Sequence, residues 1–163
     1  MRRTSGTTAA GRPYRSHMDI GRRRLPHDAG PTDSVNPEGE VYFITICCVP
    51  RVRNQLAHPE VWTLLRSTIE HREQVGDLLC RLVLAMPDHL HALMVFPGKK
   101  SMRPVIAAVK SWVAAKAKVN WQRDFFDHRL RSWESGAEKA DYIRMNPVRA
   151  GLVANPEDWP YQR

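Results

Sequence analysis

The chain has 163 residues, enough for one compact domain but too few for two of ordinary size. With 42% hydrophobic and 26% charged residues, it has the composition of a globular protein that buries a core. No window reaches the ~18 consecutive apolar residues of a membrane span, and the basic N-terminal stretch lacks the apolar segment of a secretory signal. We therefore expect a cytoplasmic protein without a membrane partner.

The first segment, residues 1–40, is rich in Arg, Gly, Pro, Ser and Thr and shows no sustained apolar period. It predicts a basic, largely irregular N-terminal arm. A single domain is expected to follow over residues 41–163.

Three apolar runs predict strands. Residues 41–49 are β-branched and aromatic, and residues 78–86 and 89–96 flank a Pro87-Asp88 turn and should form a hairpin. Because both faces of the run 89–96 are apolar, that strand should be central in its sheet.

Helical spacing of apolar residues predicts helices over residues 56–74 and 101–119. Residues 125–130 predict a short edge strand. A capping box, Ser135 with Glu138, should start a last helix that carries Tyr142 and stops by Pro147. This order of elements predicts an α+β fold: a ferredoxin-like antiparallel sheet with helices packed on it.

The chain has three cysteines and no Cys-x-x-Cys motif. Cys47 and Cys48 lie inside an apolar run, so we interpret them, with Cys80, as buried small side chains rather than disulfide or zinc ligands. This usage suits a reducing compartment.

The net charge of +8 is concentrated in residues 99–131, which contain nine Lys or Arg and two Asp or Glu. This clustering indicates an anionic partner, although a solvated helix face would also explain the lysines alone. Trp121, Phe125 and Phe126 in this segment suit stacking on single-stranded nucleic acid, or simply close the core. The candidate DNA-binding residues are Lys110, Lys116, Lys118, Arg123, Arg129 and Arg131.

The motif His89-Leu90-His91 opens the predicted central strand. Side chains two apart on a strand share a face, so the two imidazoles could chelate one divalent cation. The pattern alone is weak, and two ordinary histidines would give it as well.

Tyr142 and Asn146 lie four residues apart and should share a helix face. A hydroxyl nucleophile and an oxygen ligand at that spacing could address the same metal-bound group. The alternatives are a core tyrosine with a hydrogen-bonded hydroxyl and an asparagine that caps a helix before proline. His128 could contact phosphate, tune the site or simply lie at the surface.

Taken together, three blocks resemble those of the REP-associated tyrosine transposases, which are single-tyrosine transposases of the HUH (His-hydrophobic-His) nuclease fold. The blocks are residues 86–93 (MPDHLHAL), 121–128 (WQRDFFDH) and 141–152 (DYIRMNPVRAGL), and Tyr42-Phe43-Ile44-Thr45 resembles the family's first strand. The resemblance covers about residues 41–161, with the blocks in the expected order.

The resemblance implies a metal-dependent endonuclease and strand transferase for single-stranded DNA, acting on hairpin or repetitive extragenic DNA through a 5′-phosphotyrosine. Tyr142 would be the nucleophile, and His89, His91 and Asn146 would hold Mg²⁺ or Mn²⁺. His128 matches a family position whose role the resemblance does not assign. Such a protein would associate with the nucleoid, as a monomer or a homodimer.

Two other functions stay open at the level of sequence, besides a basic structural domain. A non-catalytic nucleic-acid-binding domain of the same fold would bind DNA without forming a covalent adduct. A metal-dependent hydrolase with a water nucleophile would turn over without Tyr142.

Overall fold

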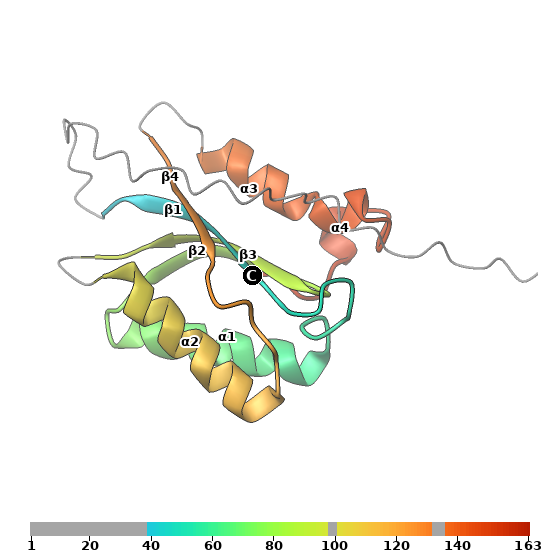
Figure 1. Ribbon diagram of the computed structural model, residues 1–163. Coiled ribbons are helices and arrows are strands. Elements are labelled where there is room, and N and C mark those ends of the chain that lie inside the picture. The colour runs from blue at the N-terminus through green and yellow to red at the C-terminus, as the bar shows by residue number, and fades with distance from the viewer. Residues whose placement is uncertain (1–38, 98–100, 132–135) are drawn as a thin grey trace, which may run out of the picture.

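The computed structural model describes residues 39–97, 101–131 and 136–163. Four strands form one antiparallel sheet in the order β2-β3-β1-β4 (Figure 1). The strands are β1 (Val41–Cys47), β2 (Leu79–Met86), β3 (His89–Val95) and β4 (Phe126–Arg129). The helices are α1 (Pro59–Gln74), α2 (Met102–Ala117), α3 (Gly136–Arg144), α4 (Asn146–Arg149) and a 3₁₀ turn, η1 (Pro156–Asp158).

Element order and strand order are those of a ferredoxin-like sheet, so the predicted α+β fold is confirmed. The predicted strand positions also hold: β3 pairs with β1 on one side and β2 on the other, and β4 lies at an edge. The predictions for residues 1–38 and for a cap at Ser135 lie outside the described residues.

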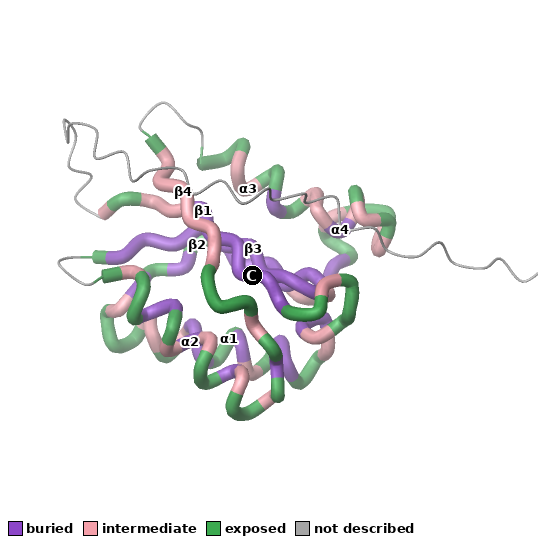
Figure 2. The backbone as a smooth tube through the Cα atoms, in the orientation of Figure 1, coloured by how far each residue is buried: buried purple, intermediate pink, exposed green. Residues whose placement is uncertain are grey.

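Helices cover both faces of the sheet. On one face α1 and α2 pack over a cluster that includes Ile44, Leu65 and Ile106. On the other face α3 and the C-terminal segment pack over a second cluster that includes Phe43 and Ile143. Figures 1 and 2 show α1 and α2 below the sheet, α3 above it, and a β3 that is buried along its whole length.

The first helix begins at Pro59, three residues later than Leu56, where the apolar spacing had placed its start. The Asn54 side chain bonds both backbone groups of Ala57, and the Leu56 amide donates to the Pro87 carbonyl at 3.1 Å. Leu56 is therefore buried as part of a loop, and Pro59 provides the first helical turn.

Three C-terminal features were not predicted: α4, η1 and the pairing of the last residues with the outer edge of β2. The Ala85 amide donates to the Tyr161 carbonyl, and Val83 and Arg163 exchange two backbone hydrogen bonds. The Arg163 guanidinium also pairs with Glu73 on α1 at 2.6 Å. Residues 161–163 thus pair with part of an otherwise open sheet edge.

All three cysteines are free and buried, as predicted. Burial is the main cause that raises the pKa of Cys48 and of Cys80 to about 12, so these thiols stay protonated. Within the described ranges, no helix is long and apolar enough to cross a bilayer.

Candidate active site

The two histidines of the His-x-His motif lie side by side on β3, on the sheet face that α3 covers. Their ring centroids are 4.7 Å apart, and the residues are 3% (His89) and 0% (His91) exposed. The His91 ring stacks on Phe43 of β1 at 5.5 Å. The prediction that His89 and His91 share one face of their strand is therefore confirmed.

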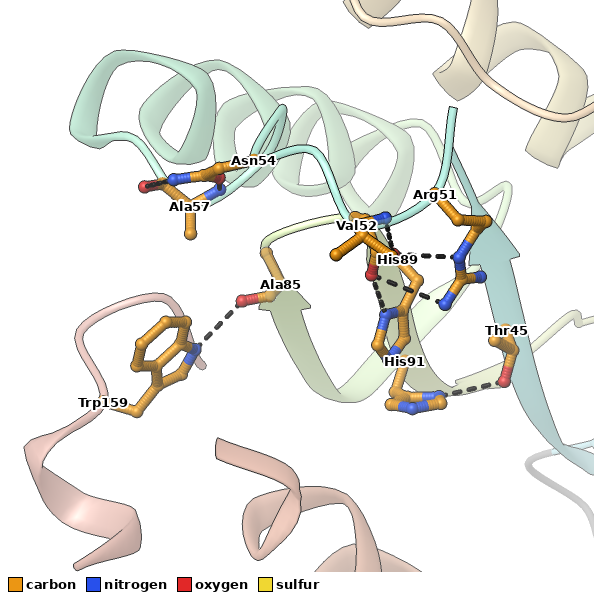
Figure 3. A network of polar contacts seen from close by, with 10 residues as sticks. Thr45, Arg51, Val52, Asn54, Ala57, Ala85, His89, His91 and Trp159 are labelled. Carbon is orange, nitrogen blue, oxygen red and sulfur yellow. Dashed lines mark hydrogen bonds and ion pairs between the residues drawn. The ribbon is translucent and has the colours of Figure 1, made fainter. Parts of the chain in front are cut away.

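Each imidazole is held at its Nδ1 atom. His89 Nδ1 lies 2.7 Å from Asp88 Oδ1, and His91 Nδ1 lies 2.9 Å from Thr45 Oγ1 (Figure 3). Both Nε2 atoms are buried and have no hydrogen-bond partner among the described residues. Burial is the main cause that holds the pKa of His91 well below its usual value, and the nearby charge of Arg51 acts in the same direction, so the His91 imidazole is neutral.

Two unsatisfied buried nitrogens in one place need an explanation, because such atoms are rare in folded proteins. Metal-binding imidazoles usually donate one ring N–H to a carboxylate or another oxygen and use the other nitrogen as ligand. His89 and His91 fit this arrangement, so the site suits a divalent cation. Within the described part of the chain, no group of three or more His, Cys, Asp or Glu side chains is arranged as a metal site, so any further ligand has to be of another kind.

The carboxylate of Asp88 is fully buried and joins His89 to the loop after β1. Arg51 Nε donates to Oδ2 at 2.9 Å, and the Val52 amide donates to the same oxygen at 2.7 Å (Figure 3). Val52 has a φ of 68°, a left-handed conformation that is rare for a β-branched residue.

Tyr142 lies on α3 above the histidines of its own chain. Its ring centroid is 6.5 Å from that of His91 and 6.3 Å from that of Phe43. The residue is 39% exposed, so the phenol is within reach of a ligand from solvent. The Arg149 guanidinium carbon stands 4.8 Å from the centre of the tyrosine ring, and Arg149 Nη1 donates to the Tyr142 carbonyl at 3.1 Å.

Asn146 begins α4 rather than ending the helix of Tyr142, because α3 stops at Arg144 and Pro147 follows. Its Nδ2 donates to the carbonyls of Tyr142 (3.0 Å) and Ile143 (3.2 Å). The side chain thus caps the end of α3, which is the alternative that the sequence left open. Both hydrogen bonds involve Nδ2 of the Asn146 side chain. A metal would bind the other side-chain atom, Oδ1.

His128 pairs with Phe43 in the β1–β4 ladder, so it lies on the sheet face of the two histidines but two strands from β3. Trp121 and Phe125 pack against the cluster of α1 and α2, and Phe126 packs against Phe43. These aromatic residues therefore close the core, whatever else they do.

The candidate DNA-binding cations are not gathered around the histidines. Lys110 Nζ donates to the carbonyls of Gln122 and Arg123 at 2.7 and 2.9 Å, and Lys116 stacks on exposed Trp112 at 5.1 Å. Both lie on α2, and Lys118 caps its end. The residues beyond α2 include Arg129, which pairs with Glu40 at 2.7 Å, and the exposed Arg123 and Arg131.

Sequence reasoning missed the side chains that support the site: Asp88, Thr45, Arg51 and Arg149. Two of them had a local signal, since Asp88 directly precedes the His-x-His motif and Arg149 lies within the third block. Thr45 and Arg51 lie at least 37 residues from their partners, so only the folded sheet reveals their contacts.

No protein-family model matches the chain. The REP-associated tyrosine transposase of Escherichia coli is 28% identical over 128 residues, which cover 76% of each chain. A Haemophilus influenzae protein that carries the same family name is 29% identical over 143 residues, covering 76% of this chain and 79% of its own.

A solved REP-associated tyrosine transposase bound to a REP hairpin superimposes with a TM-score of 0.67 at 24% identity, covering 77% of this chain and 76% of that one. This match shows the fold. The similarity to REP-associated tyrosine transposases that the three sequence blocks predicted is thereby confirmed, in sequence by the two relatives and in fold by the solved structure.

Proposed function

We propose that this chain is a metal-dependent endonuclease and strand transferase for single-stranded DNA, with Tyr142 as nucleophile. One observation carries the proposal: an accessible tyrosine ring stands 6.5 Å from one of two buried imidazoles whose Nε2 atoms have no hydrogen-bond partner among the described residues. The family names of the relatives, and the REP hairpin bound to the solved neighbour, support hairpin or repetitive extragenic DNA as the substrate.

The residues that would hold the metal are His89, His91 and Asn146. Two imidazole nitrogens and one amide oxygen form a ligand set that Mg²⁺ or Mn²⁺ accepts, with further positions for water and phosphate oxygen. When bound, such a cation polarises the scissile phosphodiester as a Lewis acid. Thr45 and Asp88 hold the two rings by their Nδ1 atoms, so the nitrogens need no rearrangement to act as ligands.

The chemical step belongs to the tyrosine. The Tyr142 Oη attacks the phosphorus, the Oη–P bond forms and the P–O3′ bond breaks. The phenolic proton leaves to water, and the departing 3′ oxygen takes up a proton. The products are a 5′-phosphotyrosine and a free 3′-OH, and a second 3′-OH can reverse the step and join strands without an external energy source.

Arg149 supports the tyrosine in two ways. Its stacking on the ring and its bond to the Tyr142 carbonyl restrict the tyrosine, and its positive charge beside the ring would attract a phosphate that approaches the phenol. The cations of α2 lie beyond the opposite sheet face. We therefore expect Lys110, Lys116 and Lys118 to hold DNA away from the reacting phosphate, with Arg123, Arg129 and Arg131 along the path between.

The proposal needs only one copy of the chain, because Tyr142 and the histidines that it would work with belong to the same molecule. A homodimer would be compatible with this site without being required by it. His128, on the same sheet face, is a candidate for active-site support rather than a ligand.

The experiment combines labelled single-stranded hairpin DNA with Mg²⁺ or Mn²⁺ and looks for a protein–DNA band that survives denaturation. Wild-type protein should give the band, and Tyr142→Phe should lose it by at least 100-fold while still binding DNA. Tyr42→Phe is the matched control, because Tyr42 packs on the opposite face and its hydroxyl bonds Glu40. That control should keep the band.

Two further arms separate the alternatives. EDTA, His89→Ala and His91→Ala should each abolish the band, and a band that survives EDTA contradicts the metal role. DNA binding without any band in the wild type indicates a non-catalytic binding domain. Cleavage that persists in Tyr142→Phe indicates a water nucleophile.

A further inference from the structure

We infer that Asp88 is a positioning residue whose buried carboxylate locks the loop of residues 50–53 to His89 and directs His89 Nε2 into the site. This inference rests on the proposed function, because the atom that it positions is a proposed metal ligand. It adds a residue to which the motif, the relatives and the ligand set assign no role.

The two oxygens of the Asp88 carboxylate accept hydrogen bonds from different partners. Oδ2 accepts from Arg51 Nε at 2.9 Å and from the Val52 amide at 2.7 Å. Oδ1 takes a short bond of 2.7 Å from His89 Nδ1, and only a long one of 3.5 Å from Arg51 Nη2. Arg51 and the Val52 amide together satisfy Oδ2. The main partner of Oδ1 is therefore His89.

The His89 imidazole can bind a metal through only one of its two nitrogens. A neutral histidine carries one ring proton, and whichever nitrogen bears it cannot bind a metal. With Nδ1–H donated to Asp88, the lone pair lies on Nε2, the buried atom with no hydrogen-bond partner among the described residues. The carboxylate therefore selects both the tautomer and the ring orientation of His89.

The backbone of Val52, next to Arg51, adopts an unusual conformation. Its φ of 68° is unfavourable for a β-branched side chain, and the residue is 56% exposed, so burial of the side chain does not explain the conformation. In this conformation the Val52 amide donates a hydrogen bond to Asp88 Oδ2 at 2.7 Å. An observed backbone outlier beside a proposed metal ligand is the kind of strain that surrounding contacts sustain at functional sites.

The test measures Mn²⁺ affinity and the His89 tautomer in the full chain without DNA, by electron paramagnetic resonance and by ¹⁵N nuclear magnetic resonance of the imidazoles. Wild-type His89 should carry its proton on Nδ1. Asp88→Ala should populate the other tautomer and weaken Mn²⁺ binding about 10- to 100-fold, as loss of a residue behind a ligand typically does. Asp88→Asn keeps one acceptor oxygen and should lie between the two.

Asp77→Asn serves as the control. It removes a comparable pair with Arg72 (3.1 Å) just before β2. The first residue of β2 pairs with Val95, at the end of β3 that is remote from His89. This variant should bind Mn²⁺ like the wild type.

The outcomes separate this inference from the proposed function. If the wild type binds Mn²⁺ and Asp88→Ala matches it in both affinity and tautomer, the positioning role is overturned. If the wild type binds no Mn²⁺, the metal-dependent function fails, and the tautomer comparison still decides the role of Asp88. Should Asp88→Ala not fold, Asp88→Asn supplies the same comparison, and wild-type behaviour in that variant overturns the inference.

Discussion

Asp88 keeps a negative charge where its side chain has no contact with water. Burial alone would raise the pKa of this carboxyl, but the hydrogen bonds from His89 and Val52 and the charge of Arg51 outweigh burial and lower the pKa to about 2. An ordinary aspartate titrates at 3.8. The difference makes the ionised form of Asp88 part of what stabilises the fold.

The contribution of Asp88 to the free energy of unfolding should therefore decrease at acidic pH. Because the folded pKa is depressed, its contribution is present above about pH 4 and is lost as the pH falls toward 2. The shift corresponds to on the order of 2 kcal/mol. Urea unfolding of the wild type and of Asp88→Asn should give a difference in unfolding free energy that shrinks by about this amount between pH 5 and 2. A difference that stays constant over that range would show that Asp88 is not specially stabilised.

At the residue scale, the sequence predicted the side chains that carry a local pattern and missed those that support them. His89 and His91 share a face because a strand alternates, and Tyr142 lies in the same chain close to His91. Thr45 could not be found, because its contact depends on the register of β1 against β3. The roles of Tyr142, His89, His91 and Asn146 remain predictions until the adduct and metal experiments are done.

At the scale of elements, α3 is the helix on which the chemistry depends, and it is weakly anchored. Ile143 is its one buried residue, and it packs with Phe43 on the side of the sheet that holds the histidines. By contrast, α2 buries Val105, Ile106, Val109 and Val113. The helix that carries Tyr142 thus depends on one fully buried apolar side chain, the partly buried Ala140, and the contacts of Arg149 and Asn146 at its end.

Ile143→Ala tests this dependence. Removing a fully buried side chain of this size should lower the unfolding free energy by about 2–4 kcal/mol and free α3 to move. Adduct formation should fall at least tenfold, while Mn²⁺ affinity should change less, because β3 keeps both histidines. Val109→Ala, on the opposite face, is the control: it should destabilise the chain with less effect on the adduct. Equal effects of both variants would count against the anchoring role of Ile143.

Helices and strands with a regular spacing of apolar residues could be predicted from the sequence. Elements whose position depends on long-range contacts could not. The four strands, α1 and α2 follow from apolar spacing and turn residues, and α3 was predicted from a capping box whose Ser135 lies outside the described residues. The late start of α1 reflects Asn54, whose side chain bonds Ala57 in place of a helical turn. The pairing of residues 161–163 with β2 has no local signal, because Tyr161 and Arg163 meet their partners only once the sheet has formed.

At the scale of the whole molecule, the sheet separates two surfaces. One carries the histidines, Tyr142 and Arg149, and the other is covered by α1 and α2, with the described cations of residues 101–131 lying on and after α2. A DNA strand that contacts both surfaces would have to pass around an edge of the sheet. This explains why charge clustering predicted an anionic partner without locating the site of chemistry.

The most direct measurement identifies the residue that carries DNA. The denaturation-resistant adduct is digested with trypsin and sequenced by mass spectrometry. Residues 140–144 form one tryptic peptide, Ala-Asp-Tyr-Ile-Arg, in which the tyrosine provides the single hydroxyl group. We expect a nucleotide joined through its 5′ phosphate to Tyr142 in this peptide. A phosphate on any other residue, or strand cleavage that leaves no nucleotide on the protein, would contradict the account.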